Sequence, residues 1–203
     1  MPKALKAIII TILIILVTYI GTVKIFNVPE KIMKKIYPKT YSEYVTDYSK
    51  EYDVDPLLVY AVIKAESNFK EDVVSNSNAK GLMQLMDSTA DEVASNIITD
   101  TTFESNMLFD AKTNIKIGTK YLSELLQKYD GNYYLAVAAY NAGIGTVDKW
   151  IQEGTIKKDG SDIENIPYKE TNNYVRKIIR DYGIYQKLYS VSYTHLRAHE
   201  TSL

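Results

Sequence analysis

A long uncharged run lies close to the start of the chain. No charged residue occurs from Ala7 to Val23, and lysines flank this run on both sides. A helix from Leu5 to Phe26 would extend for roughly 33 Å at about 1.5 Å per residue, against a hydrocarbon core of about 30 Å. No small-x-small cleavage site follows the run, so an uncleaved anchor fits better than a signal peptide. We therefore predict a start segment over residues 1–6, a transmembrane helix over 7–26 and a connector over 27–40.

Beyond residue 40, hydrophobic positions recur every three or four residues, as they do on one face of an α-helix. Four positions have the features of helix N-caps: Asp55 before Pro56, then Asp87-Ser88, Asp110 and Asn132. These patterns predict helices over residues 41–52, 55–66, 87–97, 110–129, 132–142 and 169–188.

The stretches between the predicted helices are polar or rich in glycine. In the region 68–86 we expect a very small sheet or a hairpin, and Gly143 to Gly145 should break the chain after the helix that begins at Asn132. The sequence contains no long alternating strand pattern and no internal repeat. It predicts a mainly α fold with a single helical domain over residues 41–189.

Composition and charge narrow the chemistry. The 203 residues include 24 Lys and Arg against 25 Asp and Glu, so the chain lacks the basic surface that nucleic-acid binding requires. Cysteine is absent, and the only two histidines are His195 and His199. Both lie in residues 191–203, which resemble translated read-through of a sequencing adaptor and which we exclude from the fold. Acid–base chemistry should then come from carboxylates, lysine or tyrosine, and we predict no metal and no cofactor.

Four short motifs stand out in the helical region. Alone, each has an ordinary structural explanation, such as a solvent-facing carboxylate at a helix end, a turn glycine or a core tyrosine. The motifs are Glu66-Ser67, Gly81-Leu82-Met83-Gln84, Ala139-Tyr140-Asn141-Ala142-Gly143, and Tyr174 within Glu170-Thr171-Asn172-Asn173-Tyr174. Together, in this order and at these spacings, they resemble the lytic transglycosylases of the soluble type, glycoside hydrolase family 23. The resemblance covers about residues 41–189 and implies an α+β lysozyme-like fold.

The resemblance also implies roles for these residues. Glu66 would be the general acid and then the base, and Tyr174 would hold its carboxyl through the phenol. To donate a proton near neutral pH, Glu66 needs a raised pKa, which burial in an apolar wall would supply. The other residues would contact the glycan, line the cleft or order Glu66. The predicted substrate-binding residues are Ser67, Met83, Gln84, Tyr140, Asn141 and Tyr174.

The implied substrate is a peptidoglycan strand. Most glycosidases use two carboxylates, but in this family the 2-acetamido group of N-acetylmuramic acid can stabilise the oxocarbenium-like centre, and the 6-hydroxyl of the same sugar then attacks. The implied product is a 1,6-anhydromuramoyl end, formed without water. Because peptidoglycan lies outside the cytoplasmic membrane, residues 1–6 should be cytoplasmic, and the domain after Val28 should face the wall as part of a single-pass membrane protein.

Two alternatives remain open. A hydrolytic muramidase would share the fold and the acid but would need a second carboxylate or a positioned water, and Asp72, Asp87 and Glu104 are candidates for the carboxylate. A catalytically silent wall-binding protein, held at the membrane, would need no acid. Product analysis separates the muramidase from the transglycosylase, and any turnover excludes the silent protein.

Overall fold

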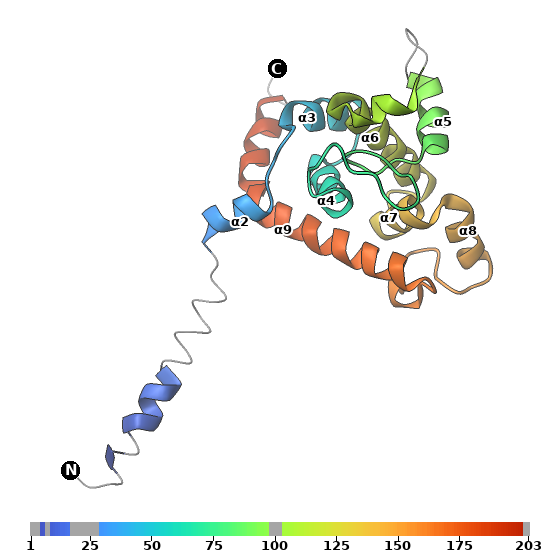
Figure 1. Ribbon diagram of the computed structural model, residues 1–203. Helices are drawn as coiled ribbons and strands as arrows, with labels where there is room; N and C mark the ends of the chain where they lie inside the picture. Colours follow the sequence, from blue (N-terminus) through green and yellow to red (C-terminus); the bar gives the residue numbers. More distant parts are fainter. Residues whose placement is uncertain (1–4, 7–8, 17–28, 98–102, 201–203) are drawn as a thin grey trace. The chain divides into compact units, whose positions relative to one another are not determined.

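The computed structural model describes residues 5–6, 9–16, 29–97 and 103–200, with side chains described up to residue 189. The chain divides into two compact units, residues 1–38 and 39–203, which we describe separately. The second unit contains most of the helices in Figure 1.

In the first unit, residues 9–16 are helical, and their isoleucine and leucine side chains are exposed. A short helix, α2 (Glu30–Ile36), follows and carries an ion pair between Lys34 and Glu30. Much of the predicted transmembrane helix, at 7–8 and from 17 onward, lies outside the described residues. Among the residues that are described, no helix has the length and apolar character needed to cross a bilayer.

In the described part of the second unit, the regular secondary structure consists of helices, which are joined by turns and loops. Local capping explains several boundaries. Asp55 accepts a hydrogen bond from the Leu57 amide at 2.8 Å, Asp110 from the Thr113 amide at 2.8 Å, and Asn132 from the Leu135 amide at 3.1 Å, which confirms three of the four predicted N-caps. At the fourth, Asp87 is itself the first residue of its helix. The elements are α3 (Ser42–Glu51), α4 (Pro56–Glu66), α5 (Asp87–Ile97), η1 (Ser105–Phe109), α6 (Ala111–Lys128), α7 (Tyr133–Ala142), α8 (Ile144–Gln152), η2 (Ile163–Asn165) and α9 (Lys169–Glu200).

The core is built around α4 and α7. Every residue of α4 from Leu57 to Ile63 is buried, because the helix packs against α3 and against the long helix α9. In α7 the residues from Leu135 to Ala139 are buried between α6, α8 and α9, and the alanines allow these helices to approach closely. A helix that is hydrophobic on all sides belongs in the interior. Figure 1 shows α9 passing along both core helices, so residues far apart in the sequence meet there.

A very small sheet or a hairpin was predicted in the region 68–86, and no sheet is formed there. Within the described residues there is no strand, and this region contains only two isolated antiparallel bridges, Val74 with Lys80 and Lys80 with Leu85. The reason is local: Asn78, Gly81 and Gln84 all have positive φ and reverse the chain too often for a ladder to extend. The segment is therefore a folded loop rather than a sheet.

Two predicted boundaries also need correction. Gly143, with φ of 85°, ends α7 as expected, but Gly145 is not part of the break because α8 starts at Ile144. The last helix was predicted to end near Leu188, whereas the backbone of α9 is helical to Glu200.

Candidate active site

Glu66 is the last residue of the buried helix α4. The helix stops there because the Ser67 amide closes its last hydrogen bond, to Ile63 at 3.0 Å, and Asn68 turns left-handed with φ of 50°. The apolar helix thereby delivers a carboxyl group to the edge of the core, where it is only partly exposed.

The Glu66 carboxyl is held by α9. The Tyr174 hydroxyl donates a hydrogen bond to Glu66 Oε1. Burial raises the pKa of Glu66 from its ordinary 4.5 to about 7, while the Tyr174 hydrogen bond and the charge of Lys177 act in the opposite direction. A carboxyl with this pKa is protonated in a large fraction of molecules at neutral pH and can donate its proton.

Tyr140, from α7, lies on the same side of the core. Its hydroxyl donates to the Met83 carbonyl at 2.8 Å, and its ring centroid is 5.2 Å from that of Tyr121 in α6. Burial, and then the negative charge of Glu66, raise the pKa of the Tyr140 phenol well above its ordinary value. Tyr140 is thus hydrogen-bonded to the folded loop through Met83, and it lies close enough to Glu66 for the carboxylate charge to affect its pKa.

The folded loop is fixed by a buried asparagine that the sequence analysis missed. Asn114 accepts from the Met83 amide at 2.8 Å and donates to the carbonyls of Lys80 at 3.0 Å and Leu108 at 2.8 Å. Its side chain is fully buried. A polar residue next to Ile115, on the apolar face of an amphipathic helix, is the signal that could have identified it.

Gln84 has its amide nitrogen committed to the loop. Nε2 donates to the carbonyls of Val73 at 3.0 Å and Gly81 at 2.9 Å, and the residue is only partly exposed. Among the described residues, no hydrogen bond to the amide oxygen is formed, so Oε1 is the atom that can accept one from a ligand.

Two of the predicted substrate-binding residues are not oriented for that role. Met83 has no exposed surface, because its side chain packs into the core beside Gly118. Ser67 is 6% exposed, and its hydroxyl donates to the Ile63 carbonyl at 3.2 Å, closing the end of α4. In this conformation neither side chain lines an open cleft. Ser67 stabilises the end of the helix that carries Glu66, and Met83 anchors the loop that carries Gln84 in the core.

Asn141 is exposed at the end of α7, next to Tyr140. Its Oδ1 accepts a hydrogen bond of 2.8 Å from the hydroxyl of Thr171, a buried residue at the start of α9. Thr171 belongs to the motif that contains Tyr174, and no role was predicted for it from the sequence. The contact shows that two of the four motifs, which lie in different helices, touch one another.

The three candidate second carboxylates, all within the described residues, are not hydrogen-bonded to the acid. Asp87 accepts two hydrogen bonds from Lys80, at 2.6 and 2.7 Å, and one from Ser105 at 2.7 Å, and the first of these contacts holds its pKa below the usual range. Asp72 and Glu104 are exposed. Within the described part of the chain, none of the three shares a hydrogen bond with Glu66 or Tyr174.

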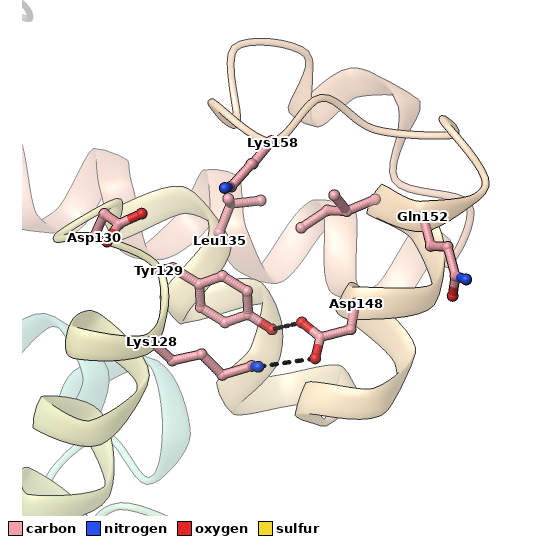
Figure 2. A pocket seen from close by; sticks show the side chains of 8 residues that line it. Lys128, Tyr129, Asp130, Leu135, Asp148, Gln152 and Lys158 are labelled. Atoms are coloured by element: carbon pink, nitrogen blue, oxygen red, sulfur yellow. Dashed lines mark hydrogen bonds and ion pairs between the residues drawn. The ribbon is translucent and has the colours of Figure 1, made fainter.

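A separate hollow of about 290 Å³ lies where α6, α7 and α8 meet, and none of the predicted site residues lines it. Figure 2 shows that its polar groups face one another: the Tyr129 hydroxyl donates to Asp148 at 2.9 Å, and Lys128 pairs with the same carboxylate at 2.9 Å. The lining residues are Lys128, Tyr129, Asp130, Leu135, Asp148, Ile151, Gln152 and Lys158.

Comparison with known proteins gives one consistent result. Over 148 residues the chain is 32% identical to the soluble lytic murein transglycosylase of Salmonella typhimurium and 30% identical to that of Escherichia coli K12, covering 72% of this chain and 23% of each relative. It spans about a quarter of the length of these relatives.

Solved structures agree with these sequence matches. The lytic transglycosylase Slt of Pseudomonas aeruginosa aligns with a TM-score of 0.68 and 32% identity, over 74% of this chain and 24% of that one. The 70 kDa soluble lytic transglycosylase of Escherichia coli aligns with a TM-score of 0.69 and 28% identity, over 76% of this chain and 25% of that one. The family model described as "Transglycosylase SLT domain" matches residues 43–163. On this evidence the chain belongs to the transglycosylase SLT domain family.

Proposed function

We propose that this protein is a peptidoglycan lytic transglycosylase with a lysozyme-like catalytic domain. It would cleave the β-1,4 bond between N-acetylmuramic acid and N-acetylglucosamine and leave 1,6-anhydromuramic ends. The observation that carries the proposal is the partly buried Glu66 carboxyl, with a pKa of about 7 and a hydrogen bond from Tyr174, in a member of this family.

A single carboxyl group, that of Glu66, can serve as both the acid and the base in this reaction. Protonated Glu66 donates its proton to the glycosidic oxygen as the bond from that oxygen to C1 of the muramic acid breaks, and the 2-acetamido group stabilises the developing positive charge. The 6-hydroxyl oxygen then bonds to C1, and its proton passes to the Glu66 carboxylate. Glu66 ends protonated, as it began, and no water is consumed. The raised pKa of Glu66 suits both steps near neutral pH.

The experiment is digestion of purified peptidoglycan by the full chain in detergent, followed by mass analysis of the soluble muropeptides. We expect anhydro-muropeptides, which are lighter by one water than hydrolysis products. Glu66→Gln is the matched control, because the amide is nearly isosteric but cannot donate the proton. It should fold normally and release essentially nothing. Reducing muramic ends alone would mean a muramidase, and a folded wild-type protein that releases no product would mean a silent wall-binding protein.

We also propose that residues 7–26 anchor the protein in the cytoplasmic membrane, with the catalytic domain on the extracytoplasmic face. The uncharged run from Ala7 to Val23 and the location of peptidoglycan support this placement. Cells carrying a C-terminal epitope should give a carbonate-resistant membrane signal that external protease removes. A variant lacking residues 1–26 is the control. A shortened wild-type protein released from the membrane would instead indicate a cleaved signal peptide.

A further inference from the structure

The end of α4 is an unfavourable place for a negative charge. The last carbonyl groups of a helix lack partners within it and give its C-terminus a partial negative charge. Glu66 occupies the last position of α4, so ionisation of its carboxyl is opposed by the helix as well as by burial. A cation at the same helix end would relieve both effects.

Lys177 is that cation. Its ammonium group donates to the Ala65 carbonyl at 2.8 Å, across 112 residues of sequence. Ala65 immediately precedes Glu66 in the last turn of α4. Lys177 lies three residues after Tyr174 on α9, and residues with this spacing project from the same face of a helix. One face of α9 therefore contacts the end of α4 at two points, the Glu66 carboxyl and the backbone next to it.

We propose that Lys177 is a positioning residue for Glu66, which binds the last turn of α4 through the Ala65 carbonyl and keeps the carboxyl in register with the Tyr174 hydroxyl. Its ammonium also supplies the positive charge at the helix end. The inference deepens the proposed function, and it rests on that function only for its activity readout.

Few charged or titratable groups face Glu66. Tyr174 and Lys177 approach from α9, Tyr140 from α7, and Tyr121 of α6 lies behind Tyr140. On α4 itself, the Lys64 ammonium donates to Asn68 Oδ1 at 3.2 Å and interacts electrostatically with Asp181, Lys177 and Arg180 of α9. Of these groups, Lys177 is the cation whose charge stabilises ionised Glu66. Removing the charge should therefore raise the pKa of Glu66.

The test compares three variants of the full chain. Lys177→Met removes the ammonium but keeps an unbranched side chain, and Lys177→Arg restores a cation with a donor group. Arg176→Met removes a positive charge from the adjacent position, where the guanidinium bonds to Asn172 within α9 at 2.8 Å, and it controls for net charge. Each protein is assayed for kcat/KM against pH, and the Glu66 carboxyl is titrated by carbon-13 NMR in the absence of substrate.

A general acid must be protonated, so kcat/KM should fall as the pH rises through the pKa of Glu66. In Lys177→Met this fall should move to higher pH by about half a unit or more, the size expected for one partly screened charge. The maximum should also drop roughly threefold to tenfold, because the carboxyl is held less firmly. Lys177→Arg should recover the wild-type profile, and Arg176→Met should match it throughout.

Two outcomes would overturn the inference: a Lys177→Met titration of Glu66 that superimposes on wild type, or an equal displacement in Arg176→Met. The NMR titration requires no turnover. If the wild-type protein released no anhydro-muropeptides, the proposed function would fail, while the titration would still decide whether Lys177 acts on Glu66.

Discussion

The hydroxyl of Tyr174 donates a hydrogen bond to Oε1 of Glu66, although 108 residues separate the two in the sequence. The packing of α4 against α9 brings them together. Within the described residues the carboxyl has no other hydrogen bond, so when Tyr174 occupies Oε1 the acidic proton belongs on Oε2. The tyrosine thus determines which oxygen presents the proton to a substrate.

Tyr174→Phe should therefore impair the acid without dismantling the fold. The ring remains, but the hydrogen bond to the carboxyl is lost, and bonds to such groups are worth about 1.5–3 kcal/mol. We expect kcat/KM to fall by about tenfold to a hundredfold. The alkaline limb of the pH profile should move to higher pH, because the Tyr174 hydrogen bond lowers the pKa of Glu66. Tyr134→Phe, at an exposed tyrosine, is the control and should change neither quantity. An unaltered Tyr174→Phe enzyme would remove Tyr174 from the mechanism.

The raised pKa of Glu66 also makes a prediction about stability. The pKa is about 7 in the folded protein against an ordinary 4.5, so the folded state holds the proton more tightly than the unfolded chain. The stability due to this proton is fully present below pH 4.5 and is lost as the pH rises through 7. At about 1.4 kcal/mol per pKa unit, the loss is about 3.5 kcal/mol.

Urea unfolding of wild type and Glu66→Gln, measured in parallel from pH 4 to 8, isolates this contribution because the other titrating groups are common to both. Glu66→Gln should gain stability relative to wild type across that interval, with most of the change between pH 4.5 and 7. A difference that stays constant with pH would show that Glu66 is not buried in the way described.

The helices could largely be predicted because their signals are local. The cap at Asp55 followed by Pro56, and the apolar run after it, define α4 with no knowledge of its neighbours. The small sheet or hairpin could not be excluded from the sequence, because a polar sequence does not reveal that Asn78 and Gln84 have positive φ. These turns come from contacts made elsewhere in the fold.

The site was predicted in part. The resemblance placed Glu66 and Tyr174 together, and the structure has that contact. The contact of Lys177 could not be predicted from the sequence, because its partner is the Ala65 backbone carbonyl, which becomes a neighbour only when α9 packs on α4. The burial of Met83 could not be predicted for a similar reason. The direction of its side chain depends on the hydrogen bond between the Met83 amide and Asn114, which lies 31 residues further along the chain.

Gly81→Ala should be severely destabilising. Gly81 has φ of +75°, and a Cβ there would lie 2.1 Å from the Leu108 carbonyl oxygen and 2.2 Å from Asn114 Nδ2. The methyl group would thus disrupt the hydrogen bonds that fix the folded loop, in a conformation that alanine already disfavours. We expect a loss of about 3 kcal/mol or more in unfolding free energy. Gly131→Ala is the matched control, because Gly131 also has positive φ but its Cβ would meet no atom within 4 Å. Equal losses in both variants would mean that strain at φ alone, and not the clash at the loop, sets the cost.

The C-terminal limit of the folded domain can be tested on α9. Tyr185 is fully buried and stacks on Tyr60 at 5.7 Å and on Tyr189 at 6.0 Å. The domain should therefore need the helix as far as Tyr189. Truncation after Ser190 removes the adaptor-like residues and should leave the melting temperature and peptidoglycan digestion unchanged.

Tyr185→Ala is the contrasting variant for this truncation. It should cost about 3–5 kcal/mol, because it opens a cavity between α4 and α9 beside the segment that carries Tyr174 and Lys177. A marked loss of stability on truncation would mean that the residues after Ser190 pack against the domain, and they would then have to be counted as part of its fold. If the truncated protein is as stable as the full chain, the extra turns of α9 contribute nothing to the core, because the tyrosine stack already ends at Tyr189.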